Sequence, residues 1–486
     1  MHFTKRGNRE SARILDVLRR YESRNVTFLA PDGSWPIVWQ RAKGVQVWDA
    51  DGNQYLDLTA AFGVAAAGHA NPRVVKAGQK QMGVLLHAMG DVHPHALKAR
   101  LARELSRITF ERWAGQSKVQ SPKFKVQGLK SEIRNPKSES DNLRSAGKTI
   151  FCNSGFEAVE AALKTAVLAT GKPGIIAFSG AYHGLGYGAL NATHRGHFRT
   201  PFRNQLRQFG RFVPFPRAQQ AGILSRSPAN DARDRQGVCS TLDALDEQIR
   251  KLLCRKNIGA VLVEPIQVRG GINIPPLEFL PRLRRICDDN KILLILDEIY
   301  TGFGRTGKWF ACEHSMAVPD LICIGKALTG GFPLSACVGR AALMDAAWPP
   351  SSGEAIHTST FLGHPVGCAM ALAQIEEIEK KDLPQRSAQL GEYLLRLLQS
   401  QITDSRFQID IRGTGLLAGA ELRLPNGAPA SKVVLHLLTA LLHRGFILLP
   451  EGEHGNVLSF TPPLTISKGQ LRAAVDALSE VLAITD

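Results

Sequence analysis

The sequence lacks several features that would assign it to a specialised class of protein. It contains no uninterrupted apolar run of the roughly 18–20 residues that a membrane-spanning helix requires. Residues 1–20 are basic but have no apolar core and carry Glu10 and Asp16, so we do not expect a secretory signal. The 8 cysteines include no C-x-x-C pair, and several lie in apolar runs such as DLICIGKAL. We therefore predict reduced core thiols in a cytoplasmic protein, without a disulfide framework, a metal site or a membrane partner.

The overall composition is that of an ordinary globular protein. Of the 486 residues, 44% are hydrophobic, 21% charged and 7% aromatic, which argues against a fibrous or wholly disordered chain. This length fits two or three domains, or one large α/β domain with a smaller companion.

The formal net charge of +17 first suggests an acidic partner. Most of the excess lies in residues 111–148 and 195–255, and neither stretch combines its charges with a nucleic-acid-binding motif. Residues 115–147 have few large apolar side chains and many Ser, Lys, Asn and Pro, so we predict a disordered or loosely attached insertion there. We interpret both basic stretches as solvated. A nucleic-acid-binding protein built on a degenerate enzyme scaffold remains the alternative from a different class.

The order of apolar segments predicts an α/β fold. Two alternating runs on either side of Asp51-Gly52 predict a hairpin. From residue 148, helical segments such as FEAVEAALKTAVLAT alternate with the strand-like runs KTIFCNSG, GIIAFSG, IGAVLVEP, KILLILDE and DLICIGKA. Such runs are typical of a mostly parallel sheet with helices on both faces. The C-terminal part predicts a smaller α+β domain, in which residues 413–424 form one strand and residues 457–464 another.

The loop GFGRTGK, residues 302–308, matches two nucleotide-binding motifs in spacing only. Its glycines satisfy G-x-G-x-x-G, but the helix and the acidic strand end that should follow are missing. It also satisfies G-x-x-x-x-G-K, but Trp309 stands where a P-loop needs a Ser or Thr hydroxyl. The sequence therefore disfavours a nucleotide-dependent enzyme.

Polar residues follow the predicted strands at the positions where open α/β sheets bind ligands. Asp297 ends KILLILD, Lys326 ends LICIGK, Tyr182 follows GIIAFSG, and Ser154-Gly155 begins a helix. Each residue alone has a structural explanation, such as a cap or a core aromatic. Together they meet the needs of pyridoxal phosphate, which requires a lysine for a Schiff base, a carboxylate at its pyridine nitrogen and a helix N-terminus for its phosphate. An aromatic face to stack on the ring completes the set.

With these residues in place, the sequence resembles the class III, or ω-type, pyridoxal-phosphate aminotransferases of fold type I. The resemblance covers nearly the whole chain outside residues 115–147. It implies a large cofactor-binding domain over residues 71–380, a smaller domain formed by residues 1–70 and 381–486, and a homodimer with active sites at the subunit interface. The segments that carry it are VWDADGNQYLDL, GHANP, NSGFEAVEAALK, GAYHG, VEPIQ, LDEIYTGFGRTGKW, PDLICIGKALTGGFPLSA, HTSTFLGHPVGCAMALA and FTPPLTIS.

The resemblance also implies roles for particular residues. Lys326 would carry the cofactor and move the proton during the reaction, and Asp297 would keep the pyridine nitrogen protonated. Tyr182 would stack on the ring. The other implied contacts are Ser154 with the backbone of Gly155 and Phe156 at the phosphate, Thr360 from the neighbouring subunit, and Tyr300, Glu264 and Gln267 near the ring.

Two departures from the family's pattern concern the substrate. Members that use α-carboxylate substrates often have Arg just before the final PPL segment, where this chain has Ser459. Many of them also have Glu two residues after VEPIQ, where this chain has Arg269. We expect that the usual carboxylate clamp is absent and that Arg269 holds the carboxylate of the amino acceptor; a structural or surface role for Arg269 is the alternative. Phe62 is a further candidate for contact with the substrate.

The resemblance implies that the enzyme moves an amino group from an amine or ω-amino acid to a 2-oxo acid by a ping-pong mechanism. An aminomutase or a decarboxylase of the same family would use the same lysine, aspartate and phosphate cradle. The residues around the cofactor do not separate these reactions.

Overall fold

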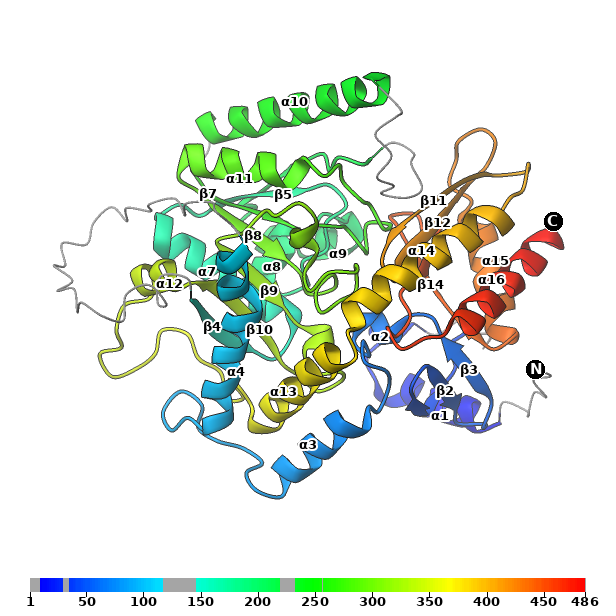
Figure 1. Cartoon of the computed structure of the whole chain (residues 1–486), viewed down its shortest axis with the longest axis horizontal. Coiled ribbons are helices and arrows are strands. Elements are labelled where there is room, and N and C mark those ends of the chain that lie inside the picture. Colours follow the sequence, from blue (N-terminus) through cyan, green and yellow to red (C-terminus); the bar gives the residue numbers. More distant parts are fainter. Residues whose placement is uncertain (1–8, 29–34, 117–145, 219–231, 256, 486) are drawn as a thin grey trace.

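The computed structural model describes residues 9–28, 35–116, 146–218, 232–255 and 257–485 (Figure 1). The predicted insertion at 115–147 therefore lies largely outside the described residues, as does the middle of the basic stretch at 195–255. No helix among the described residues is long and apolar enough to cross a membrane.

Within the described residues, seven strands form the central sheet, in the order β4-β10-β9-β8-β7-β5-β6. β10 runs antiparallel to both of its neighbours, and the other described pairings are parallel. Every residue of β7 and β8 is buried, because both faces of the sheet are covered. The strands are β4 (Gly147–Cys152), β5 (Gly174–Phe178), β6 (Gly210–Val213), β7 (Ile258–Val263), β8 (Leu293–Asp297), β9 (Leu321–Ile324) and β10 (Ser335–Arg340).

Helices lie over both faces of this sheet. Alternate residues of the strands enter two separate apolar clusters, one of which includes the alanine-rich buried side of α7. The helices up to the end of the central region are α1 (Arg9–Tyr21), α2 (Ala60–Gly63), α3 (Pro72–Met82), α4 (Ala96–Ser106), α5 (Arg112–Gln116), α7 (Gly155–Thr170), α8 (Tyr187–Ala192), α9 (Gly196–Arg199), α10 (Ala232–Arg255), α11 (Phe279–Asn290), α12 (Ala341–Ala347) and α13 (Pro365–Lys380).

Two smaller sheets contain the terminal segments, which lie together on one side of the molecule (Figure 1). The predicted hairpin is confirmed, since β2 (Gln46–Asp49) and β3 (Gln54–Asp57) pair antiparallel beside β1 (Trp39–Lys43). β13 (Phe446–Ile447) pairs parallel with β3, so both ends of the chain contribute to this sheet. Such pairing suits a domain built from both ends, although boundaries at residues 70 and 380 stay a prediction.

The C-terminal sheet corrects one prediction. Residues 413–424 do not form one strand, because the chain turns at Gly415, whose φ is +55°, between β11 (Gln408–Thr414) and β12 (Leu417–Arg423). A side chain at Gly415 would lie 2.4 Å from the backbone of Thr306, so only glycine fits this turn. The sheet continues with β15 (Val457–Phe460) and β14 (Leu449–Glu451). It packs against α14 (Leu383–Gln401) and α15 (Ser431–His443), and α16 (Lys468–Ala483) packs against these two helices.

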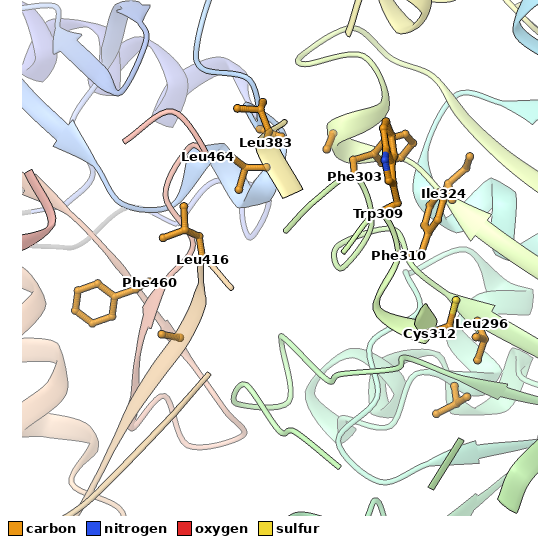
Figure 2. Packing of buried hydrophobic residues seen from close by; sticks show 14 of the residues in the cluster. Leu296, Phe303, Trp309, Phe310, Cys312, Ile324, Leu383, Leu416, Phe460 and Leu464 are labelled. Carbon is orange, nitrogen blue, oxygen red and sulfur yellow. The ribbon is translucent and has the colours of Figure 1, made fainter. Parts of the chain in front are cut away.

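The loop at 302–308 joins the central region to the C-terminal part. Figure 2 shows Phe303, Trp309 and Phe310 on the side of the central sheet and Leu383, Leu416 and Phe460 on the other side; all belong to one apolar cluster. Gly307, with φ of +92°, lies so close to α14 that a Cβ there would be 3.0 Å from the Cβ of Ala388. The glycine at this position therefore allows the loop to pack closely against α14.

The predicted core position of the cysteines is correct for all but one of those whose side chains the structure describes. The seven cysteines whose side chains the structure describes are free thiols, and six of these are buried. Cys254 is the exception, because it is exposed near the end of α10 rather than in the core.

We expect Phe310 to be a major contributor to stability. Its side chain is 0% exposed, and its ring lies edge-on to Trp113 at 5.8 Å and Phe303 at 5.7 Å between centroids. Phe310→Ala should lower the free energy of unfolding by about 3–5 kcal/mol, because it leaves a cavity in the core. Denaturant unfolding measures this, with Phe202→Ala as the control, since Phe202 is 47% exposed. Equal losses in both variants would contradict the packing described here.

Candidate active site

The parallel strands β7, β8 and β9 bring Glu264, Asp297 and Lys326 to one edge of the central sheet. Glu264 follows β7 directly, Asp297 is the last residue of β8, and Lys326 follows β9 after one glycine. Hydrogen bonds between the three strands fix the register, in which Asp297 lies beside Cys323. The structure thus brings polar side chains together at the edge of the sheet where the sequence predicted them.

Asp297 is buried and has a histidine partner. Its Oδ2 lies 2.8 Å from Nδ1 of His183, and its Oδ1 accepts from the backbone N–H of Ile299 at 3.1 Å. Both side chains are nearly inaccessible, at 5% and 2% exposure. A proton on Nδ1 would donate to the carboxylate and hold it in place. His183 was not predicted as a site residue, although it stands in the quoted segment GAYHG.

Lys326 lies in an electrostatic environment that favours a neutral amine. Burial lowers the pKa of Lys326, while the carboxylates of Asp297 and Glu264 act against this shift. Its Nζ is 4.5 Å from the centroid of the Tyr300 ring. The backbone at Lys326 has φ of +41°, in the left-handed region that a residue with a side chain seldom adopts. Strain of this kind is concentrated at functional sites.

Glu264 is a second buried carboxylate at this edge. Its Oε2 accepts from the backbone N–H of Tyr182 at 3.1 Å, so it positions the segment that carries Tyr182 and His183. Burial raises the pKa of Glu264 to about 7, and the charge of Asp297 adds to this effect whereas His183 opposes it.

The N-terminus of α7 lies near the same edge, with Ser154 as its N-cap residue. The Glu157 carboxylate accepts from the backbone N–H groups of Asn153 at 2.7 Å and Ser154 at 3.4 Å, and the second of these contacts is one half of a capping box. Within the described residues, the buried Oγ of Ser154 has no hydrogen-bond partner. Gly155 packs tightly on Ile299, because a Cβ there would approach that side chain to 3.1 Å. Phe156 is 37% exposed and packs against the loop at Gly184.

Two tyrosines follow strands of the central sheet, Tyr182 after β5 and Tyr300 after β8. The ring of Tyr182 is edge-on to Phe198 at 5.5 Å, and the Tyr300 hydroxyl lies 3.2 Å from Oγ1 of Thr461. Burial raises the pKa of Tyr300, so its hydroxyl stays protonated. Phe62 is 47% exposed and follows two alanines that, like Phe62 itself, have positive φ.

Gln267 and Thr360 are the two remaining residues that were predicted to contact the cofactor. The Gln267 amide is already engaged, since Nε2 donates to the Ser179 carbonyl at 2.8 Å and Oε1 accepts from Asn273 at 3.0 Å. Thr360 is exposed on the segment that precedes α13 and makes no described contact with the residues above.

Arg269 forms an ion pair that the sequence did not reveal. Its Nη1 lies 3.5 Å from Oε1 of Glu451, which belongs to β14 of the C-terminal sheet and is only 2% exposed. The Arg269 guanidinium also lies 5.5 Å from the centroid of the Tyr182 ring and 5.9 Å from that of Phe62. No motif includes Glu451, and only the folded chain brings it next to Arg269.

Comparison with known proteins identifies the family. Residues 29–121 and 126–482 match the model of the family described as aminotransferase class-III. The chain belongs to the class-III aminotransferases. It is 33% identical over 448 residues to the acetylornithine aminotransferase of Methanosarcina mazei, covering 92% of each chain. It is 32% identical over 449 residues to a 5-aminovalerate aminotransferase of Pseudomonas aeruginosa, covering 92% of this chain and 93% of the relative.

A solved structure supports the same assignment. The fold matches that of an amine transaminase from an uncultivated Pseudomonas species, in its pyridoxal-phosphate-bound form, with a TM-score of 0.78 and 27% identity over 96% of this chain and 98% of that one. Class-III aminotransferases depend on pyridoxal phosphate, and this chain is an enzyme that transfers amino groups. The fold type I prediction is confirmed.

The environment of Lys326 leads to a prediction about its protonation. In cofactor-free protein, Lys326 should lose its proton below pH 10.5, the ordinary lysine value, because burial disfavours the ammonium. Competitive acetylation across a pH series, read by mass spectrometry, measures this with the exposed Lys291 as the reference. Asp297→Asn should move the Lys326 midpoint further down, since it removes a charge that stabilises the ammonium. A midpoint at or above 10.5 would contradict the prediction.

Proposed function

We propose that the protein transfers an amino group from an amine or ω-amino acid to a 2-oxo acid in a ping-pong cycle, using pyridoxal phosphate. The observation that carries this proposal is the convergence of Lys326, the Asp297–His183 pair and the N-terminus of α7 at one edge of the sheet.

The residues present fit this cofactor. The α7 N-terminus offers backbone N–H groups and a positive helix-dipole end for a phosphate, and the unpartnered Ser154 Oγ among the described residues offers a further hydrogen bond. Lys326 provides an amine whose pKa is lowered by burial, as covalent attachment to an aldehyde requires. Asp297 provides the carboxylate for the ring nitrogen, and Tyr182 an aromatic face for the ring.

When bound, pyridoxal phosphate supplies an electron-withdrawing ring joined to the transferred nitrogen, which makes the neighbouring C–H bond acidic. Asp297 would hold a proton at the ring nitrogen, with His183 fixing the orientation of its carboxylate. The Lys326 amine, when it is not bonded to the cofactor, would take the proton from the substrate Cα and deliver it to C4′ of the cofactor. The buried surroundings of Tyr300 and Glu264 would limit the access of water.

The active enzyme is proposed to be a homodimer. Exposed apolar side chains are concentrated in residues 82–92 and 356–361, and a hydrogen bond of 2.5 Å between Thr358 and Asp91 joins these segments. A patch of this kind is typical of a protein interface. Thr360 lies within it, which supports its role as a phosphate contact in the neighbouring subunit. The cytoplasmic location stays a prediction from the sequence.

Lys326→Ala tests the proposed function directly. The wild-type protein should show a visible absorption band that amino donors bleach, and the variant should lose the band and at least roughly 10³-fold in turnover, since it lacks both the attachment point and the base. Absorption spectra and initial rates measure this. The exposed Lys291→Ala is the matched control. A wild-type protein that stays colourless with added pyridoxal phosphate would refute the proposal.

Arg269 is expected to hold the carboxylate of the amino acceptor. Arg269→Ala should raise the KM for 2-oxo acids by roughly tenfold or more, because a charge-assisted hydrogen bond is lost. Steady-state kinetics with varied acceptor measure this. Arg207→Ala, at an exposed position of the basic stretch, controls for a change in overall charge. An unchanged KM in Arg269→Ala would leave Arg269 with a structural role only.

A further inference from the structure

Two histidines stand at the starts of helices that pack against each other, and both accept hydrogen bonds from the backbone. His95 is the N-cap residue of α4, and its Nδ1 accepts from the N–H of Lys98 at 3.3 Å. His364 is the N-cap residue of α13, and its Nδ1 accepts from the N–H of Val366 at 3.2 Å. Helices usually begin with Ser, Thr, Asp or Asn, none of which changes charge near neutral pH. Both caps here therefore depend on the protonation of an imidazole.

The two caps belong to one junction between residues 87–98 and 357–368, which we call the histidine junction. Nε2 of His95 lies 2.7 Å from the carbonyl oxygen of Gly363, the residue before His364. Because a carbonyl oxygen only accepts, Nε2 carries the proton and Nδ1 is the acceptor, so the contacts of His95 require the neutral imidazole. The ring of His87 lies 6.1 Å from that of His364 between centroids.

Protonation would remove both caps. An imidazolium has protons on both ring nitrogens, so Nδ1 can no longer accept and the two backbone N–H groups lose their partner. The new charge also lies at the positive end of each helix dipole, where a cation is unfavourable. Because His87 stands in the same junction, each bound proton opposes the next.

We propose that the histidine junction is a pH-sensitive switch: proton uptake by His95 and His364 opens the first turns of α4 and α13 and separates residues 87–95 from residues 357–364. These segments overlap the exposed apolar residues 82–92 and 356–361 that are assigned above to the subunit interface. The homodimer should therefore dissociate as the pH falls below neutrality. This second step rests on the proposed function, whereas the opening of the two turns does not.

The opening is expected in the range in which histidine titrates. Burial lowers the pKa of His364, and the charges of His87 and His95 add to this shift. As the pH falls, the unfolded turn takes up its proton near the ordinary histidine value of 6.5, before the folded turn does. The stability that this cap contributes is thus complete above that value and is lost as the pH drops below it.

The other ionisable groups of the junction do not reverse this effect. A hydrogen bond from Thr358 lowers the pKa of Asp91, which stays ionised, and burial raises the pKa of Cys368 to about 12, which keeps its thiol neutral. Lys98 can only gain positive charge as the pH falls, so it adds to the repulsion.

Groups on the neighbouring elements either act in the same direction or belong to residue types that do not titrate near neutral pH. Nδ1 of His357 lies 3.1 Å from Nζ of Lys164 on α7, so a proton on His357 would also turn a contact into a repulsion. The other charged side chains of the two helices that pack along α13 are Arg73, Lys76 and Lys80 on α3, and Arg100, Arg103 and Glu104 on α4.

Asparagine tests the switch, because it is a preferred N-cap residue without an ionisable group. Hydrogen exchange read by mass spectrometry, expressed as protection factors between pH 8 and pH 5, reports on the first turns of α4 and α13. In the wild-type protein, protection of both turns should fall by about fivefold or more. His95→Asn should abolish this loss at α4, His364→Asn should abolish it at α13, and the double variant should abolish both. Any loss of the contact with Gly363 in His95→Asn would be the same at every pH.

Sedimentation velocity over the same pH range measures the subunit equilibrium. The dissociation constant should rise at least roughly tenfold between pH 8 and pH 5 in the wild-type protein, and it should stay constant in the double variant. His436→Asn, at an exposed position of α15, is the matched control and should respond like the wild-type protein. If the double variant does not fold, the two single variants still test each cap at its own helix.

Protection factors that do not change with pH in the wild-type protein, or that fall equally in the double variant, would overturn the switch. A dimer that persists at pH 5 while both turns open would overturn the link to dissociation. Failure of the proposed homodimer is distinguishable, because the wild-type protein would then be a monomer already at pH 8, while the exchange data would still decide on the caps.

Discussion

The backbone hydrogen bonds between β7, β8 and β9 are the constraint on which the site depends. They hold three neighbouring strands parallel and in register, so that the residues just beyond the strands meet at one edge. The apolar side chains of these strands are buried on both faces, and a shift of one residue would exchange the two faces. The packing of the core thus also fixes the positions of Glu264, Asp297 and Lys326.

Burying carboxylates at this edge costs free energy, and a hydrogen-bond or ion-pair partner offsets part of that cost for each of them. Asp297 has His183, Glu264 has the backbone N–H of Tyr182, and Glu451 has Arg269. These partners all come from segments outside the strands, whereas Glu451 itself belongs to β14 of the C-terminal sheet. The pairing of Arg269 with Glu451 therefore connects the segment that follows β7 to the C-terminal sheet.

The sequence predicted the elements whose residues follow a local pattern. The continuous apolar runs predicted β4, β5, β7, β8 and β9, and the polar residues at the ends of these runs predicted that Lys326 and Asp297 lie at one edge of the sheet. β6 and β10 were not predicted, since GRFV is short and contains an arginine, and SACVGR begins with serine and ends with glycine and arginine. The turn at Gly415 was missed because its reason, a close approach to Thr306, involves a residue more than a hundred positions away. The same holds for Glu451, whose significance arises only from its contact with Arg269.

The pairing of β3 with β13 has a consequence for how the molecule is made. The two strands are about 390 residues apart, so at synthesis rates of roughly 5–20 residues per second β13 follows β3 after about 20–80 s. During this interval the sheet formed by β1, β2 and β3 lacks its fourth strand, and the edge of β3 remains open to association with other chains. Glu451 and Thr461 also reach the site only at the end of synthesis. A nascent chain can thus complete its central sheet before Glu451 and Thr461 join the residues at its edge.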